Sequence, residues 1–330
     1  MIKAIYSING EVTTGYKALK ISEDYKKKKS NLMWIDIYLE NHELGQEETM
    51  LLSESFKFHE MSIEDCLFPQ YPKIEEFENY VLTAVHGIQL KPHFFQEFED
   101  SIYELDIFVG KGFVVTVHAE ELFFLETLFE KAKTRPQIEM KSLENLLYNI
   151  FNKVVSSYEF TLEKIDDKME NLEDKILEEP GTVNMEEILN TKKVIFAMRK
   201  IAESQQTPYV YFTRAHNDLI SKEHLVYFRD IYTQYAKMNQ SIVMRSQMVV
   251  SMLEVYMSSV TLRLTEVMKF LTVIATVLMP VLIISGYYGM NIKFPEYSIF
   301  GERELWVFAV FLMLGSIIAM LIYFKKKKWF

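Results

Sequence analysis

Two long runs of residues without a charge lie close together in this chain, over residues 270–288 and 305–324. A helix rises about 1.5 Å per residue, so each run is long enough to cross the hydrocarbon core of a bilayer, which is about 30 Å thick. Soluble proteins seldom bury helices of this length without a charge. The two runs therefore predict a membrane hairpin whose connecting loop, residues 289–304, is short and polar.

The basic residues around the hairpin predict its orientation. Four lysines lie in the tail of residues 325–330, and Arg263 and Lys269 precede the first run, whereas the loop holds only Lys293 and Arg303. Because cytoplasmic loops carry an excess of Lys and Arg, both ends of the chain are expected in the cytoplasm and the loop outside. The chain also opens on a strand-like alternation rather than a signal peptide. We expect a multi-pass protein of the inner membrane.

Residues 1–140 have the mixed pattern of a cytoplasmic α/β domain. Short segments rich in β-branched and aromatic residues alternate there with helical stretches. They predict strands at Ile2–Ile8, Met33–Leu39, Tyr80–Gln89, Tyr103–Val109 and Phe113–His118. With the membrane hairpin, this domain makes the chain an α+β membrane protein.

The pattern becomes helical after this domain. Apolar periodicity predicts helices over residues 142–179 and 184–206, separated by Pro180-Gly181, with a further break at Pro208. We expect residues 141–222 to form a cytoplasmic helical hairpin region.

The last helical segment is much longer than a bilayer. No Gly or Pro interrupts it from residue 224 until Pro280, and about 65 residues make a helix of about 97 Å. A stalk helix over residues 223–269 therefore continues into the first span. Its apolar residues recur at near-heptad spacing, at Met244, Met248, Met252, Tyr256 and Val260. Such a helix needs partners, which are either other copies of the chain or the two preceding helices.

Composition argues against several classes of function. The formal net charge of -10 argues against nucleic-acid binding. The single cysteine, Cys66, excludes a disulfide framework, and the seven histidines show no HExxH spacing. No GxxxxGK[ST] motif is present, so a nucleotide-driven pump is not expected. No nucleophile and base stand out either, which argues against a hydrolase, and we expect no enzyme activity.

The chemistry is concentrated in Tyr288-Gly289-Met290-Asn291, directly after the first span. Gly289 is expected to end the helix with a positive φ, and Asn291 to present its amide oxygen at a pore mouth. Mg²⁺ dehydrates reluctantly, so a ring of neutral amides that grips its water shell suits it better than a cage of carboxylates. An ordinary helix cap of Gly and Asn is the alternative reading.

Gly-Met-Asn at this topological position resembles the signature of the CorA family of Mg²⁺ transporters. The resemblance covers nearly the whole chain and includes Pro72-Lys73-Ile74-Glu75, Phe77-Glu78-Asn79-Tyr80, Tyr227-Phe228-Arg229-Asp230, Val267-Met268-Lys269 and Pro280. It implies a homopentamer with a funnel-shaped cytoplasmic domain. It also implies one long pore-lining helix per subunit and gating by intracellular Mg²⁺.

One face of the first span is a candidate pore lining. Uncharged residues recur at steps of three and four, at Met268, Leu271 or Thr272, Ala275, Met279, Leu282 and Gly286. Around a common axis they would form a narrow apolar neck that gates by dewetting. Periodicity alone equally allows them to face lipid or the second span. The resemblance assigns Met268, Leu271, Met279 and Gly286 to the pore.

Other candidate residues follow from the same resemblance, with some departures. Thr265 stands where the family usually has Asn, and Glu254 keeps an acidic ring where some members have Asp. Glu296, in the loop, could attract cations from outside. Asp230 is a candidate regulatory metal ligand, which in some members pairs with a carboxylate of the neighbouring subunit. Lys91 stands about where that carboxylate would fall, so Asp230 is either a sensor or an ordinary surface residue.

These observations predict a passive, gated channel for Mg²⁺ uptake that closes when intracellular Mg²⁺ is high. A divalent cation gains roughly 2 × 2.3 kcal/mol per 100 mV of membrane potential, which is sufficient for uptake. The expected partners are further copies of the chain, the bilayer and divalent cations, with Co²⁺ or Ni²⁺ as possible cargo beside Mg²⁺. One alternative is a Zn²⁺ or Co²⁺/Ni²⁺ transporter of the same superfamily. The other is a membrane-anchored signalling or scaffold protein.

Overall fold

The computed structural model describes the chain except for residues 9–10, 16, 27–29, 179–182, 215–218, 291–300, 328 and 330. The chain divides into two compact units. The first unit contains residues 1–175 and 183–253, and the second contains residues 176–182 and 254–330.

A mixed seven-stranded sheet forms the centre of the first unit, in the order β2-β1-β3-β7-β6-β5-β4. The strands are β1 (Ile2–Ile8), β2 (Glu11–Gly15), β3 (Ser30–Tyr38), β4 (Lys73–Glu76), β5 (Tyr80–Ile88), β6 (Ile102–Gly110) and β7 (Phe113–His118). The β3–β7 pair is parallel and the other pairs are antiparallel. All five strands predicted from the sequence are confirmed. The two that the pattern missed, β2 and β4, are the edge strands, which are short and polar.

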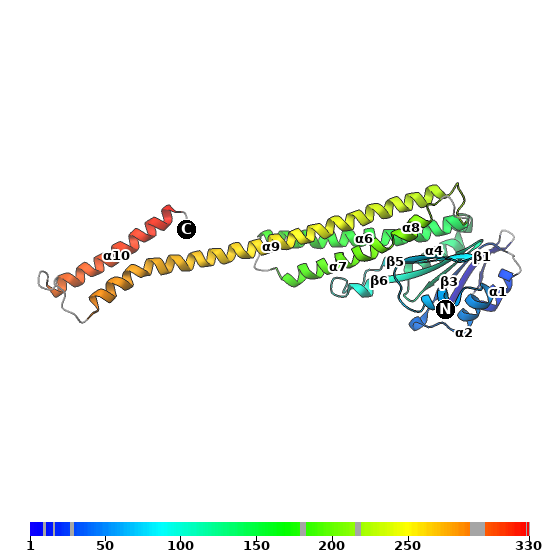
Figure 1. Cartoon of the computed structure of the whole chain (residues 1–330), viewed down its shortest axis with the longest axis horizontal. Coiled ribbons are helices and arrows are strands. Elements are labelled where there is room, and N and C mark those ends of the chain that lie inside the picture. The colour runs from blue at the N-terminus through cyan, green and yellow to red at the C-terminus, as the bar shows by residue number, and fades with distance from the viewer. Residues whose placement is uncertain are drawn as a thin grey trace. The chain divides into compact units, whose positions relative to one another are not determined.

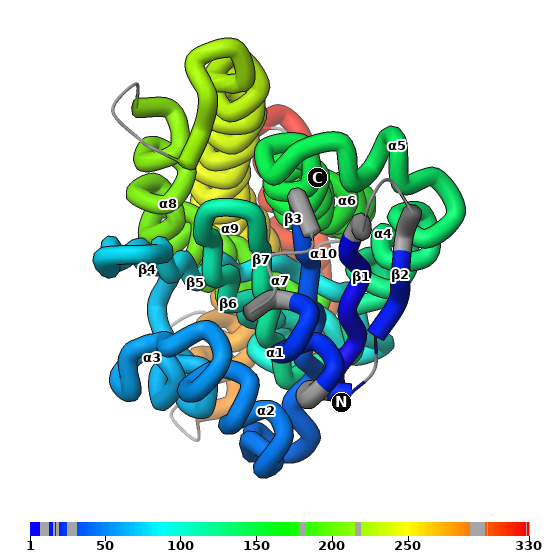
Figure 2. Tube along the Cα trace, turned by 90° about the vertical axis from the view of Figure 1, so that its right-hand side faces the viewer, coloured from blue at the N-terminus to red at the C-terminus, as the bar shows by residue number. Residues whose placement is uncertain are grey.

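Helices cover both faces of the sheet (Figure 2). The first face is covered by α1 (Ala18–Lys26), α2 (Gln46–Met50), the short helix η2 (Leu51–Ser55) and α3 (Glu60–Asp65), and its core includes Tyr6, Met33 and Phe108. The other face carries α4 (Phe123–Thr134), whose Phe129 ring lies 5.5 Å from the Trp34 ring. The short elements η1 (Glu40–His42), η3 (Phe98–Ser101) and α5 (Pro136–Glu139) lie in the connections.

The helical region consists of α6 (Leu143–Glu178), α7 (Met185–Ser204), α8 (Gln206–Tyr211) and α9 (Leu225–Tyr288). The prediction of a break at Pro208 is wrong. The chain turns at Gln205, and Pro208 lies in the first turn of α8, where a helix does not need its N–H.

The first part of α9 packs on helices of its own chain, through a stripe that includes Tyr235, Met238 and Ile242. The Tyr235 hydroxyl donates a hydrogen bond to the carbonyl of Ala202 at 2.5 Å. Met244 and Met248 of the expected apolar stripe are each 54% exposed. The helix therefore uses its own chain on one side and leaves a methionine-bearing side uncovered.

The second unit contains the end of α9 and α10 (Glu302–Lys326), which Figure 1 shows as a helical hairpin. Both helices contain an apolar window long enough to cross a membrane, and only 6% and 11% of those windows are buried within the chain. Core helices of a soluble protein would be mostly buried, whereas apolar helices exposed in this way need lipid or other chains around them.

Candidate ion pathway

One side of the hairpin part of α9 packs against α10. Val273 is 4% exposed, and Leu305, Ala309 and Phe324 of α10 are similarly buried. At the opposite end of the hairpin from the loop, the Lys269 ammonium lies 5.7 Å from the centre of the Trp329 ring. These contacts identify the side of α9 that is occupied by its own chain.

The candidate pore residues lie on the other side of α9. At about 100° per residue, Met268, Leu271, Met279 and Gly286 are about 120–160° around the helix from Val273. The three larger side chains are 62–68% exposed, and apart from the adjacent backbone of α9 no atom of the described residues lies within 4 Å of a Cβ added at Gly286. Periodicity left open that these residues pack on the second span. The structure excludes this alternative, because their face of α9 does not pack on α10 of the same chain. Its place at a pore axis stays a prediction.

Thr265 and Glu254 are exposed on the segment of α9 before the span. The Thr265 hydroxyl donates a hydrogen bond to the carbonyl of Thr261 at 2.9 Å. Its proton is therefore used within the helix, while the oxygen can still accept a hydrogen bond from outside. A hydrated cation presents water hydrogens, so Thr265 can act on such an ion as an acceptor.

The α9 helix ends at Tyr288 without a left-handed residue. The Gly289 N–H donates to the carbonyl of Ser285 at 2.8 Å, and the Met290 N–H donates to Tyr287 at 3.3 Å. The expectation of a positive φ at Gly289 is wrong. Among the glycines that the structure describes, the one with a positive φ is Gly112. A Cβ at position 289 would lie 2.8 Å from the Ser285 oxygen, so glycine is needed for this close approach. Asn291 and Glu296 lie outside the described residues.

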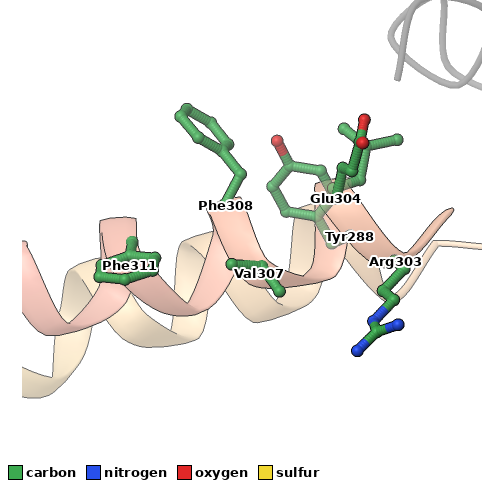
Figure 3. Close-up of a pocket in the computed structure, with 7 residues that line it drawn as sticks. Tyr288, Arg303, Glu304, Val307, Phe308 and Phe311 are labelled. Carbon is green, nitrogen blue, oxygen red and sulfur yellow. The ribbon is translucent and has the colours of Figure 1, made fainter. Parts of the chain in front are cut away.

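A groove of about 780 Å³ lies where α9 ends and α10 begins. Figure 3 shows Tyr288, Glu304 and Phe308 on one side of α10, with Arg303 directed to the other side. The remaining lining residues are apolar. A divalent cation such as Mg²⁺ requires several oxygen ligands, so this lining is suited to packing rather than to ion binding.

Asp230 and Lys91 both lie in the first unit. The exposed Asp230 carboxylate accepts a hydrogen bond from the Gln234 side chain at 2.8 Å, one turn further along α9. The Lys91 ammonium lies 3.4 Å from the Glu120 carboxylate. Asp230 has free coordination capacity within its own chain, and its role as a metal ligand stays a prediction.

Comparisons with known proteins place this geometry in context. A family model described as CorA-like Mg²⁺ transporter protein matches residues 29–326. The chain is 33% identical over 288 residues to the cobalt/magnesium transport protein CorA of Thermotoga maritima, over 84% of this chain and 78% of that protein. It is 26% identical over 275 residues to the cobalt/magnesium transport protein CorA of Methanocaldococcus jannaschii, over 82% of each chain.

Solved structures show the same fold. The complete structure of the CorA magnesium transporter from Methanocaldococcus jannaschii is similar with a TM-score of 0.80 and 22% identity, over 100% of this chain and 99% of that chain. The ZntB cytoplasmic domain from Vibrio parahaemolyticus gives a TM-score of 0.59 at 12% identity, over 76% of this chain and 94% of that chain. At these identities the likeness shows the fold alone.

Proposed function

The chain belongs to the CorA-like family of Mg²⁺ transporters, a family of divalent-cation transporters, and from this premise we propose that it is a passive, gated channel for Mg²⁺ uptake. The observation that carries the proposal is the uncharged face of α9 that its own hairpin leaves uncovered and that leads to Gly-Met-Asn. Co²⁺ is proposed as a second cargo, because relatives are named cobalt/magnesium transport proteins.

One copy of α9 cannot enclose a pathway, so several copies must surround an axis. The exposure of Met244 and Met248 on the stalk, and of Met268 and Met279 in the span, supports contacts with other copies along the whole helix. We propose a homopentamer, the number that the resemblance to the family implies. Both termini are proposed to lie in the cytoplasm, because the basic residues gather at that end of the hairpin.

The proposed selection acts on the hydrated ion. Five Asn291 amide oxygens would accept hydrogen bonds from the water shell of Mg²⁺, which the ion gives up reluctantly. Beyond them, Met279, Leu271 and Met268 form an apolar neck that conducts only when it is wet. The membrane potential supplies roughly 2 × 2.3 kcal/mol per 100 mV for inward movement.

The proposed closure by intracellular Mg²⁺ involves Asp230. A cation shared between Asp230 and the neighbouring subunit would hold the closed arrangement, and loss of the cation would release it. Replacement of Asp230 by Asn should weaken the protection that Mg²⁺ gives the cytoplasmic region against protease. Asp167→Asn, another exposed carboxylate, is the control, and equal protection in both variants would remove Asp230 from the mechanism.

The central experiment is ion uptake into proteoliposomes with an imposed negative-inside potential. Mg²⁺, Co²⁺, Ni²⁺ and Zn²⁺ are compared for the wild type, for Asn291→Ala and for Asn171→Ala, an exposed asparagine of α6. We expect Mg²⁺ uptake in the wild type and the control and its loss in Asn291→Ala. Undiminished Mg²⁺ uptake in Asn291→Ala would refute the asparagine ring. Uptake of Zn²⁺ without Mg²⁺ would instead favour the zinc transporter.

A further inference from the structure

A second site with metal-binding chemistry lies at one end of the sheet. A pocket of about 340 Å³ is built wholly from residues 42–120, and we call it the sheet-end pocket. Five carboxylates, three imidazoles and one thiol line it. No Lys or Arg is among its described lining residues.

The strand register brings the central donors together. His86 of β5 is the cross-strand partner of Glu104 of β6, and Asp106 follows two residues later on the same face. Ala84 stands opposite Asp106, and its small side chain leaves room above the strand. Cys66, the residue at the C-terminal end of α3, lies near Asp106 at this face, and its thiol donates a hydrogen bond to the Ser62 carbonyl at 3.4 Å.

Several of the atoms that could bind a metal ion are buried and have no hydrogen-bond partner among the described residues. Asp106 is 4% exposed and its Oδ1 has no hydrogen-bond partner in the described structure. The same is true of Oε1 of Glu104 and of both ring nitrogens of His86. Buried polar atoms are normally satisfied, because an unpaired one costs about 1–3 kcal/mol. Unpartnered donors directed into a pocket therefore indicate a ligand that completes them.

The neighbouring charged groups are already engaged and do not complete the cluster. The Lys73 ammonium lies 2.5 Å from the Asp65 carboxylate and 3.0 Å from that of Glu75. Nδ1 of His118 lies 2.6 Å from the carbonyl of Glu120, and its Nε2, which makes no hydrogen bond among the described residues, faces the Asp36 carboxylate at 3.3 Å. His118 is for that reason a neighbour of the cluster and not one of its donors.

The spacing of His86 and Glu104 suits a metal ion with short bonds. Oε2 of Glu104 accepts a hydrogen bond from the Gln70 N–H at 2.9 Å and keeps further lone-pair capacity for a second partner. Nε2 of His86 and Oε2 of Glu104 are 3.6 Å apart. Two ligands at about 2.0–2.1 Å from one tetrahedral ion would be about 3.3–3.4 Å apart. In the present conformation no group of three or more such side chains among the described residues is arranged to hold an ion. The side chains of Asp106 and Cys66 therefore have to rotate for their carboxylate and thiolate to reach an ion held by His86 and Glu104.

We propose that His86, Glu104, Asp106 and Cys66 form a cytoplasmic binding site for a divalent transition-metal cation of the Zn²⁺ or Co²⁺ class. Imidazole and thiolate are the ligands that these metals prefer, whereas Mg²⁺ takes oxygen ligands in an octahedral shell and keeps several waters. Exposed Glu99 and Asp100 at the lining add negative charge that favours entry of a cation. The site does not depend on the proposed ion pathway, because no residue is shared between them.

The test uses the full-length protein in detergent, freed of any affinity tag and loaded with Co²⁺. Thiolate coordination to Co²⁺ gives a charge-transfer absorption band, and tetrahedral geometry gives intense visible bands. We expect both in the wild type in the presence of excess Mg²⁺, and loss of the charge-transfer band in Cys66→Ser. The same spectrum should persist in Asn291→Ala, which separates this site from the pathway.

Affinity measured by Co²⁺ titration identifies the other ligands. His86→Ala and Asp106→Asn should each weaken binding at least about tenfold. The matched control is His93→Ala, which removes an exposed imidazole. Asp106→Asn keeps the shape of the side chain, and circular dichroism verifies that each variant is folded. Undiminished binding in both His86→Ala and Asp106→Asn, or displacement of Co²⁺ by an equal concentration of Mg²⁺, would overturn the proposal.

Discussion

The Tyr158 hydroxyl connects the helical region to the centre of the sheet, and its removal gives a well-defined test of the fold. It donates a hydrogen bond to the carbonyl of His86 at 3.0 Å and accepts one from Nε2 of Gln205 at 2.6 Å. The Gln205 side chain in turn accepts a hydrogen bond from the N–H of His86 at 3.0 Å. Burial, together with the nearby Tyr103, raises the pKa of Tyr158 well above its ordinary value, so the hydroxyl is a neutral donor.

Replacement of Tyr158 by Phe keeps the ring and removes both bonds. No cavity larger than a hydroxyl is formed, so the cost arises from the His86 carbonyl and the Gln205 amide that are left without a partner. At about 1–3 kcal/mol for each of the two unsatisfied groups, we expect the free energy of unfolding to fall by roughly 2–6 kcal/mol. The melting temperature should fall by roughly 2–4 °C for each kcal/mol.

Tyr209 provides a matched control within the same aromatic cluster. It is also buried, at 3% exposed, but its hydroxyl has no hydrogen-bond partner in the described structure. Tyr209→Phe should therefore be neutral or stabilising. Thermal unfolding of the full-length protein in detergent gives the global effect, and hydrogen exchange at the amides of β5 locates it. Equal destabilisation by the two substitutions would refute the reasoning, because it would show that the network contributes no more than the ring packing.

Three further predictions concern the C-terminal end of α9, the apolar neck of the proposed pore and the stability of the protein at acidic pH. Gly289→Ala should lower Mg²⁺ uptake several-fold without changing the oligomer seen by size exclusion, because its methyl group would collide with the Ser285 carbonyl. Gly301→Ala should leave uptake unchanged, because no atom of the described residues lies within 4 Å of the new methyl group. Met279→Ser should hydrate the neck and raise uptake at intracellular Mg²⁺ concentrations that close the wild-type channel. Leu314→Ser, at a similarly exposed position of α10, should have no effect. Burial acts to raise the pKa of Glu144, but hydrogen bonds from its own backbone and from two serines outweigh it and lower the pKa below 4.5. Its stabilisation is therefore complete above pH 4.5 and lost as the pH falls through the lower folded value, so Glu144→Gln should reduce the drop in melting temperature between pH 7 and strongly acidic pH.

The sequence was sufficient for those features that depend on hydrophobic pattern. The two spans, the central strands and the extent of the long helix follow from runs and periods that do not need a partner. The edge strands β2 and β4 were missed because half-exposed edge strands need few apolar residues. At position 289 the sequence predicts glycine for a positive φ, whereas the structure requires it for a close approach to the Ser285 carbonyl. Both features favour glycine, so the residue type alone does not distinguish them.

The sheet-end pocket shows where sequence reasoning stops. Glu104 and Asp106 stand two residues apart in an otherwise apolar strand, and this alternation could have indicated a polar face. Nothing in the sequence pairs them with His86, which is 18 residues away from Glu104 and faces it only through the β5–β6 register. The cluster depends on strand pairing, and pairing is a tertiary property.

The proposed ion pathway and the sheet-end pocket differ in how well they can distinguish one metal from another. A neutral neck and an amide ring that hold an ion through its water shell respond mainly to charge and hydrated size, and hydrated Mg²⁺ and Co²⁺ are alike in both. Such a pathway cannot reject a transition metal by ligand preference. A pocket with imidazole, carboxylate and thiol donors contacts the bare ion and can therefore distinguish the two metals. If both proposals hold, the chain admits divalent cations with little selectivity at the membrane and recognises transition metals only in the cytoplasm, so mutations in the pocket should change the response to Co²⁺ while Mg²⁺ uptake stays the same.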